Sequence, residues 1–222
     1  MAGDGVGYRA NVAVAIDRGR IVALGPAADV CAEFNAERTI NADHHVALPG
    51  FVDAHMHTAW CLLRGLAQDT RHWMMYGLSP FSAHLAPEAM EAGSQLAILE
   101  GHKSGTTTFA DFGWSDEIGS LEVGKRADLI LVDCDRVTLT LVHASPMRNL
   151  VPNLVYAARG DEVDTVIIDG QVVLENGRLL TLDEPAIIST AQRLAAAIGP
   201  AAESDFLRVN GPNAQFMRDG RL

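Results

Sequence analysis

The feature that most constrains this chain is a change in its pattern at residues 113–116. Before it, an apolar run over residues 46–54, a helical pattern over 87–103 and a β-branched run over 106–112 predict strand, helix and strand. Strands joined through a crossover helix pair in parallel. After the change, short strand-like runs separated by turn residues predict an antiparallel sheet. The chain is therefore expected to join one parallel unit to antiparallel structure.

Several other elements are expected from turn and capping residues. Two β-hairpins are predicted around Asp17-Arg18-Gly19 and around Asp169-Gly170. Asp183 is expected to cap a helix that ends at Gly199-Pro200, with a weakly ordered tail after it. Further strands are predicted at residues 38–42, 129–133 and 139–142, and a short helix or a loop at 27–37.

Composition excludes some classes of protein. The formal net charge is −11, which disfavours nucleic acid as a partner because a phosphate-binding surface needs a basic patch. No apolar run is long enough to span a bilayer, and the first residues lack the pattern of a signal peptide. The three cysteines are few and widely spaced, which is typical of a reducing compartment. We therefore expect a cytoplasmic protein that binds neither nucleic acid nor membrane.

His55 and His57 are the candidate metal ligands. Residues two apart on a strand point the same way, so both imidazoles are expected at the end of the apolar run. Active sites of α/β barrels lie at this end of the strands, and neutral imidazoles suit zinc or iron. A His-x-His pair alone is a weak signal, and two structural histidines are the alternative.

Several segments carry a resemblance to a known family. Leu48-Pro49-Gly50-Phe51-Val52-Asp53 precedes the histidine pair, and similar motifs occur at residues 62–66, 104–111, 119–133, 153–160 and 166–174. Together they resemble the amidohydrolase superfamily, in its branch of aminohydrolases and chlorohydrolases acting on purines, pyrimidines and triazines. The resemblance extends over about residues 11–198 and is interrupted by one large gap at 113–116.

The resemblance implies a β-sandwich domain together with a (β/α)8 barrel. Such a barrel takes about 250 residues by itself, so a chain of 222 residues is too short for both. The expected fold is mixed α/β: an antiparallel β-sandwich from both chain ends plus an incomplete (β/α)8-type barrel fragment. The expected parts are residues 1–45 and 114–182 for the sandwich, 46–113 for the partial barrel, and 183–222 for the helix and tail.

The resemblance also implies a site. It makes His55 and His57 ligands of one divalent metal ion, zinc or iron. The family's third histidine, its metal-binding aspartate and its proton-transfer residues belong to the absent portion, so no catalytic residue is assigned. Asp111, at the end of the second parallel strand, is a possible additional ligand. The other histidines are expected to be structural: His44, His45, His72, His84, His102 and His143.

Three functions follow as hypotheses. The first is hydrolysis or deamination of C–N bonds in a small cyclic amine by a chain that is inactive alone. Activity would then require further ligands from a homo-oligomer or a complementing chain. The second is a non-catalytic remnant of the family. The third is a binding or assembly module that docks a partner through its open strand edges.

Overall fold

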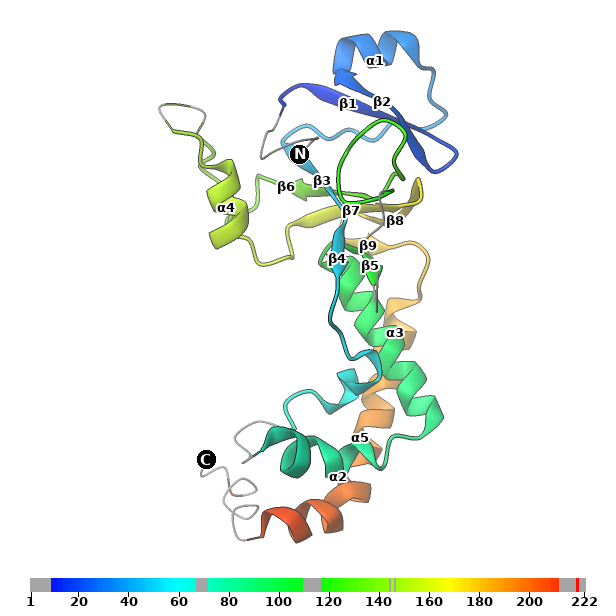
Figure 1. Cartoon of the computed structure of the whole chain (residues 1–222), viewed down its shortest axis with the longest axis vertical. Helices are drawn as coiled ribbons and strands as arrows, with labels where there is room; N and C mark the ends of the chain where they lie inside the picture. Colours follow the sequence, from blue (N-terminus) through cyan, green and yellow to red (C-terminus); the bar gives the residue numbers. More distant parts are fainter. Residues whose placement is uncertain are drawn as a thin grey trace. The chain divides into compact units, whose positions relative to one another are not determined.

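A computed structural model of the chain describes residues 9–66, 72–109, 117–143, 145, 147–211 and 219. The chain divides into two compact units, one of residues 1–56 and 101–182, the other of residues 57–100 and 183–222. Strands dominate the first unit and helices the second, which confirms the mixed α/β class (Figure 1). The division of the chain after residues 45, 113 and 182 stays a prediction.

The strands are β1 (Val12–Asp17), β2 (Arg20–Pro26), β3 (His45–Pro49), β4 (Phe51–Asp53), β5 (Thr106–Phe109), β6 (Leu129–Asp133), β7 (Val163–Ile168), β8 (Gln171–Glu175) and β9 (Arg178–Leu179). The α-helices are α1 (Ala27–Glu33), α2 (Ser79–Ser82), α3 (Pro87–Lys103), α4 (Leu150–Tyr156) and α5 (Glu184–Asn210). A 3₁₀-helix, η1 (Thr58–Leu63), and a π-helix, η2 (Trp73–Leu78), precede α2.

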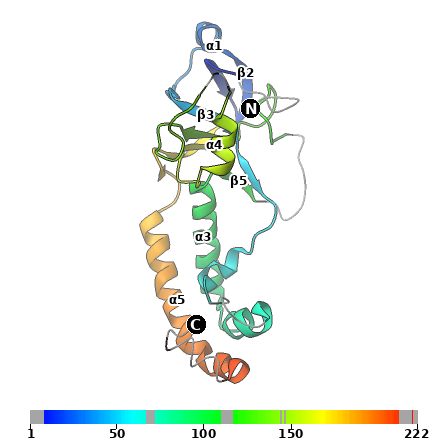
Figure 2. The same cartoon turned by 90° about the vertical axis from the view of Figure 1, so that its left-hand side faces the viewer.

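The first unit is built on a five-stranded antiparallel sheet in the order β3-β6-β7-β8-β9. Strand β3 comes from the N-terminal part of the chain and pairs with β6, which follows the predicted join. Hairpin β1–β2 forms a separate two-stranded sheet, and α1 lies against it in both views (Figures 1 and 2). Buried side chains from the hairpin and the large sheet form one apolar cluster, which includes Ile21, Leu129 and Ile167.

Two-residue turns with positive φ connect the hairpins, as the right-handed twist of the strands requires. Both predicted hairpins are confirmed: Arg18-Gly19 joins β1 to β2, and Asp169-Gly170 joins β7 to β8. The two turns contact each other so closely that a Cβ on Gly19 would lie 2.7 Å from the Asp169 carboxylate. Glycine is therefore required here both by its φ of 76° and by space.

Gly50 marks the point where the chain passes from one sheet to another. The expected apolar strand before the histidines is split there into β3, in the large sheet, and β4, in a small parallel pair. A side chain at this position would overlap Thr107 of β5, since a Cβ would lie 2.1 Å from the Thr107 hydroxyl. Strand β4 pairs in parallel with β5, and α3 connects the two strands in the chain. This confirms the predicted strand–helix–strand unit.

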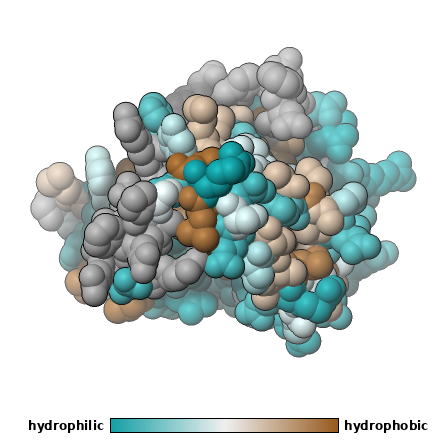
Figure 3. Space-filling view, turned by 90° about the horizontal axis from the view of Figure 1, so that it is seen from below, coloured by the Kyte–Doolittle hydropathy of each residue, from teal (hydrophilic) through white to brown (hydrophobic). Residues whose placement is uncertain are grey.

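The second unit is helical. Its buried core joins Leu63 of η1, Phe81 of α2 and Ala202 of α5, with other apolar residues around them. The apolar face expected for α5 is confirmed, because Ile187, Ala191 and Ile198 are buried. The face seen from below exposes hydrophobic residues among hydrophilic ones (Figure 3). No helix in the described parts of the chain has the length and apolar character needed to cross a membrane.

The predicted end of α5 at Gly199-Pro200 is wrong. The Asp183 side chain caps the helix as expected, but the helix continues through Pro200 to Asn210 and changes direction along its length (Figure 1). Proline in a helix interior removes a hydrogen bond and bends the axis. Buried Ala202, and the Phe206 ring 5.2 Å from that of Phe81, give the second half tertiary packing that outweighs this cost.

Two other predicted strands are absent. Residues 38–42 do not pair with any strand. Residues 139–142 begin with a turn closed by bonds from the Leu139 and Thr140 amides to the Arg136 carbonyl, and Leu141 has a φ of 70°, which a strand excludes.

Candidate metal centre

His55 and His57 follow the carboxyl end of β4. The Asp53 carboxylate accepts a 3.0 Å hydrogen bond from the His55 amide, which closes the turn after the strand. The His57 carbonyl accepts one from the Trp60 amide at 3.1 Å and so begins η1. Strand β4 ends at Asp53, so a turn and not the alternation of a strand carries the two imidazoles.

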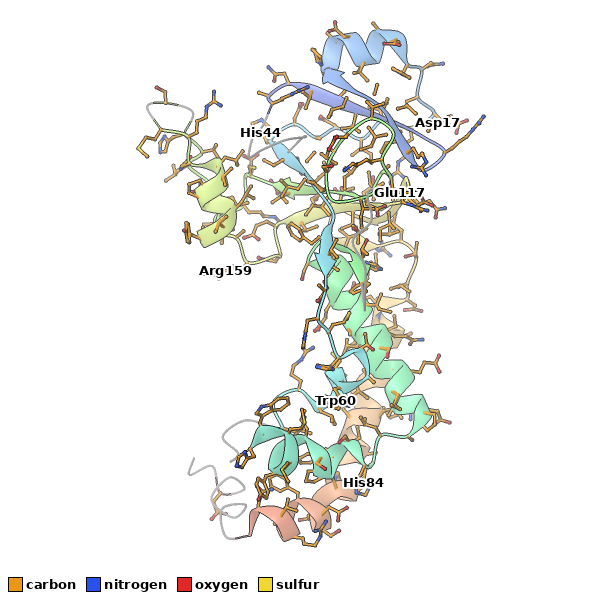
Figure 4. The ribbon with its side chains drawn as sticks, viewed as in Figure 1. Asp17, His44, Trp60, His84, Glu117 and Arg159 are labelled. Atoms are coloured by element: carbon orange, nitrogen blue, oxygen red, sulfur yellow. The ribbon has the colours of Figure 1, made fainter. Side chains whose placement is uncertain are left out.

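Both histidines are exposed to solvent. The His57 ring stacks on Trp60, with ring centroids 5.1 Å apart and planes inclined by 24° (Trp60 is labelled in Figure 4). The indole thus orients one candidate ligand.

The described residues do not complete a zinc site. Within the ranges that the structure covers, no group of three or more His, Cys, Asp or Glu side chains is arranged to hold a metal ion. A catalytic zinc takes three protein ligands and a water, and two imidazoles supply only part of that set. Asp111, the predicted additional ligand, lies outside the described residues. The assignment of His55, His57 and Asp111 to a metal stays a prediction.

The side chains of His45, His84 and His102 have protein partners. His84 Nε2 lies 3.1 Å from an Asp205 carboxylate oxygen, and His102 Nδ1 lies 2.9 Å from the Thr106 carbonyl oxygen (His84 is labelled in Figure 4). His45 Nδ1 lies 2.7 Å from the carbonyl oxygen of Asp43. These contacts support the structural roles expected for His45, His84 and His102.

A cluster of Cys61, Arg64 and Glu100 was missed by the sequence reasoning. Arg64 donates to the Glu100 carboxylate at 2.6 Å and to the Cys61 sulfur at 3.1 Å. Burial raises the pKa of the Cys61 thiol, Arg64 opposes that rise and Glu100 adds to it, so the thiol stays protonated at neutral pH. The cluster ties the turn after η1 to α3, and nothing in the sequence links positions 64 and 100.

The motif at residues 119–130 has a structural role. The backbones of Gly124, Lys125 and Ala127 exchange hydrogen bonds of 2.8–2.9 Å with Gly19 and Ile21. Next to them, Arg126 bonds to Glu117 at 2.9 Å and to Asp169 at 3.0 Å. The buried Asp128 carboxylate accepts from the Asp169 amide at 2.7 Å. The motif therefore joins the β1–β2 hairpin to the large sheet.

Strand β4 of the parallel β4–β5 pair leads into the histidine pair. The chain matches the amidohydrolase family over residues 46–114 and 112–173. These matches cover more than half of the chain, and it therefore belongs to the amidohydrolase family. The two matched ranges overlap at residues 112–114, where the sequence pattern changes.

Three of the relatives that match are deaminases by name. A 5-methylthioadenosine/S-adenosylhomocysteine deaminase from Syntrophobacter fumaroxidans is 44% identical over 101 residues, which are 45% of this chain and 23% of that protein. The enzyme of that name from Lawsonia intracellularis is 30% identical over 63% of this chain and 34% of its own. A 5'-deoxyadenosine deaminase from Methanobrevibacter smithii is 36% identical over a stretch that covers 54% of this chain and 25% of that protein. The chain thus spans about a quarter to a third of these relatives.

A solved structure shares the fold. The crystal structure of an adenosine deaminase from Xanthomonas campestris with bound zinc superimposes with a TM-score of 0.76. The superposition covers 85% of this chain and 94% of that one at 16% sequence identity. The likeness therefore extends over almost the whole of a chain of similar length, and at this identity it concerns the fold alone.

Proposed function

We propose that this chain is the histidine-bearing part of a metal-dependent deaminase acting on an adenosine-type nucleoside. The observation that carries the proposal is the position of His55 and His57. They follow the parallel strand β4, inside the segment that matches the amidohydrolase family, and the matching relatives deaminate adenosine-type nucleosides. Deamination of such a substrate consumes one water, replaces the exocyclic amine by a carbonyl and releases ammonia.

Zinc is the metal we propose, with iron as the alternative. The structurally similar adenosine deaminase has bound zinc, and two neutral imidazoles suit this ion. When bound, the metal would supply an activated water. On this chain His55 and His57 would bind the ion, and the stack on Trp60 would hold the second ring in place.

The remaining ligands must come from elsewhere. We infer that a complementing chain or a second copy supplies them, with Asp111 as a possible contributor from this chain. The shape of the fold supports this inference. A two-stranded parallel sheet such as β4–β5 is marginal unless further strands or helices cover it, as in a (β/α)8-type barrel. The pairing of β3 with β6 similarly supports a sandwich built from both ends of the chain.

A non-catalytic role is the second candidate. It is favoured by one observation, that the described residues contain no three-ligand group. In that case the chain would be a remnant of the family, or a module that binds a partner, and the two histidines would hold no metal. The two candidates differ in a measurable way, because only the deaminase releases ammonia.

The test uses the tagged full chain, purified without chelators from the cells that produce it, together with any protein bound to it. Ammonia release is measured with adenosine, 5'-methylthioadenosine and S-adenosylhomocysteine. We expect turnover that is lost in the His55→Ala, His57→Ala double variant. It should be retained in His44→Ala, a control at an exposed histidine outside the matched segment. Absence of turnover in metal-loaded wild-type preparations would establish the non-catalytic role.

A further inference from the structure

Strand β1 has one long edge that pairs with no other strand in the described parts of the chain. Its partner is β2 alone, and the hairpin forms a two-stranded sheet of its own. The far edge of β2 is taken up near its start, where Ile21 exchanges backbone hydrogen bonds of 2.8 and 2.9 Å with Gly124 and Lys125. A sheet of two strands has little stability of its own. A further strand on the β1 side would therefore stabilise the hairpin.

The backbone of Val12 points toward this open edge. Val12 lies opposite Pro26, which has no N–H, so the two residues cannot exchange a pair of backbone hydrogen bonds. The neighbouring residue Asn11 does bond to the other strand, because its carbonyl accepts from the Ala27 amide at 2.9 Å. The two directions alternate along an antiparallel strand. The N–H and C=O of Val12 therefore face away from β2.

The same alternation turns Val14 and Ile16 outward. The one irregularity of the hairpin adds Val22 to β2, where it has no partner, and leaves β1 without an extra residue. Alternate residues of β1 therefore keep their directions up to Ile16. Each of the three outward residues offers one N–H and one C=O, in a single row along the edge.

This edge lacks the features that normally keep an edge strand from pairing with another chain. Such strands are short, or carry a charge or a proline. Strand β9 has two residues and includes Arg178, and β3 ends at Pro49. Residues 12–16, in contrast, are Val-Ala-Val-Ala-Ile, with no charge and no proline, and all five are only partly buried. The β1 edge is open to a partner strand.

The sequence of the edge is complementary to itself. In an antiparallel pair of two β1 strands centred on Val14, this residue would lie opposite its own copy and Val12 opposite Ile16. These pairs are β-branched, and they would meet on the face where Val14 and Ile16 pack against the core of the unit. On the other face Ala13 would lie opposite Ala15. The outward residues 12, 14 and 16 would also be the ones that exchange hydrogen bonds in this register.

Charge favours the antiparallel arrangement. The one carboxylate of β1 is that of Asp17 at the turn end, 3.8 Å from Arg18 (Asp17 is labelled in Figure 4). In a pair centred on Val14 the two Asp17 residues would lie at opposite ends, about 20 Å apart at about 3.4 Å per residue. This exceeds the Debye length of about 8 Å, whereas a parallel pair would place the two carboxylates side by side.

We propose that β1 pairs with β1 of a second copy of this chain, antiparallel and centred on Val14. The two hairpins then form one four-stranded sheet in the order β2-β1-β1-β2. Each edge occupies the other, so the contact is isologous and association stops at the dimer. The strand carries no residue of the candidate metal centre, and this inference is independent of the proposed deaminase activity.

Sedimentation velocity of the full chain, over a wide range of concentrations, tests the proposal together with amide hydrogen exchange by NMR. We expect a monomer–dimer equilibrium that is tighter at high salt, because salt screens the repulsion between two chains of net charge −11. In the dimer the amides of Val12, Val14 and Ile16 should be protected, and dilution to the monomer should speed their exchange by about tenfold or more. The amides of Ala13 and Ala15 face β2 and should stay protected in both states.

Two variants block the edge and leave the hydrogen bonds within the hairpin in place. Val14→Pro removes an N–H that faces the partner strand, and Val12→Lys places a charge opposite Ile16 of the second copy. Each should weaken the dimer by about tenfold or more. Val14→Ala keeps the N–H and should dimerise more tightly than Val14→Pro. Val137→Lys adds the same charge at a valine that is 89% exposed and should dimerise as the wild type does.

Circular dichroism of each variant confirms that it is folded. A wild-type chain that stays monomeric at every concentration would overturn the proposal, as would association that grows past the dimer. Protection of the Val12, Val14 and Ile16 amides in the monomer would assign the edge to another segment of the same chain, which also contradicts it. A dimer that both edge variants leave unchanged would place the contact elsewhere on the molecule.

Discussion

Replacement of Glu162 should destabilise the first unit more than any other single carboxylate change we consider. The Glu162 side chain is 2% exposed and lies between α4 and β7. One carboxylate oxygen accepts from the Thr138 hydroxyl, and the other accepts from the amides of Arg159 and Gly160, each at 2.9 Å. This one side chain therefore holds Thr138 next to the backbone of Arg159 and Gly160.

The size of the effect follows from these donors. Hydrogen bonds to a charged group contribute about 1.5–3 kcal/mol each, and a buried donor left alone costs about 1–3 kcal/mol. Glu162→Ala removes the acceptor of two amides and one hydroxyl, so we expect about 3–5 kcal/mol of destabilisation. Glu162→Gln keeps one oxygen for the amides and turns its NH₂ toward the Thr138 hydroxyl, and should cost about 1–2 kcal/mol.

The same contacts fix the pH dependence. Burial alone would raise the pKa of Glu162, but the Thr138 hydroxyl and the Arg159 and Gly160 amides outweigh it and lower the pKa. A lowered pKa in the folded state means that the stabilisation is present above the unfolded value of about 4.3. It is lost as the pH falls through the folded value. The difference between the wild type and Glu162→Gln should therefore shrink in acid.

Urea unfolding followed by circular dichroism, at neutral pH and below about pH 4, measures these differences. Asp161→Ala is the matched control, because Asp161 is the neighbouring acidic residue and is exposed. It should change the free energy of unfolding by less than about 0.5 kcal/mol. The role assigned to the Glu162 hydrogen bonds would be refuted if Glu162→Ala destabilised the protein as little as this control does. It would also be refuted if the destabilisation were the same at every pH.

Two other changes have defined outcomes. Asp128→Ala leaves the Asp169 amide of the β7–β8 turn without its 2.7 Å acceptor, and should destabilise the first unit by about 1–3 kcal/mol in urea unfolding. An unchanged midpoint would contradict the structural role of the family motif. At Cys61 the two neighbours act in opposite directions. Arg64→Met should raise the pKa of the thiol and slow its alkylation, and Glu100→Gln should lower the pKa and speed alkylation, as followed by mass spectrometry of the Cys61 peptide. A shift of the thiol pKa in the same direction in both variants would contradict the roles assigned to Arg64 and Glu100.

Local signals in the sequence predicted much of the fold. Gly19 and Gly170 allowed both hairpins to be predicted, because a two-residue hairpin turn needs positive φ. The Asp183 cap and the apolar period after it gave the start and the buried face of α5. The crossover pattern gave the parallel pairing of β4 with β5. In each case the information lies within a few residues of the element.

The misses depend on contacts between distant positions. A proline such as Pro200 normally ends a helix. Helix α5 continues past it because Phe206 packs on Phe81. Residues 139–142 have the composition of a strand, yet Asn149 closes a loop there that a strand pattern does not show. The Arg64–Glu100 pair in the candidate site likewise joins residues 36 positions apart. The assignment of His55 and His57 as metal ligands comes from a short motif and stays a prediction.

Metal binding by His55 and His57 tests the central claim most directly. Zinc content per chain is measured by elemental analysis of protein purified without chelators, for the wild type, the His55→Ala, His57→Ala variant and the His44→Ala control. The account predicts zinc in the wild type and in the control, and its loss from the double variant. Two results would contradict the claim that these two imidazoles are metal ligands. One is zinc retained by the double variant, and the other is a wild-type chain that holds no zinc even when it is purified with its bound partners.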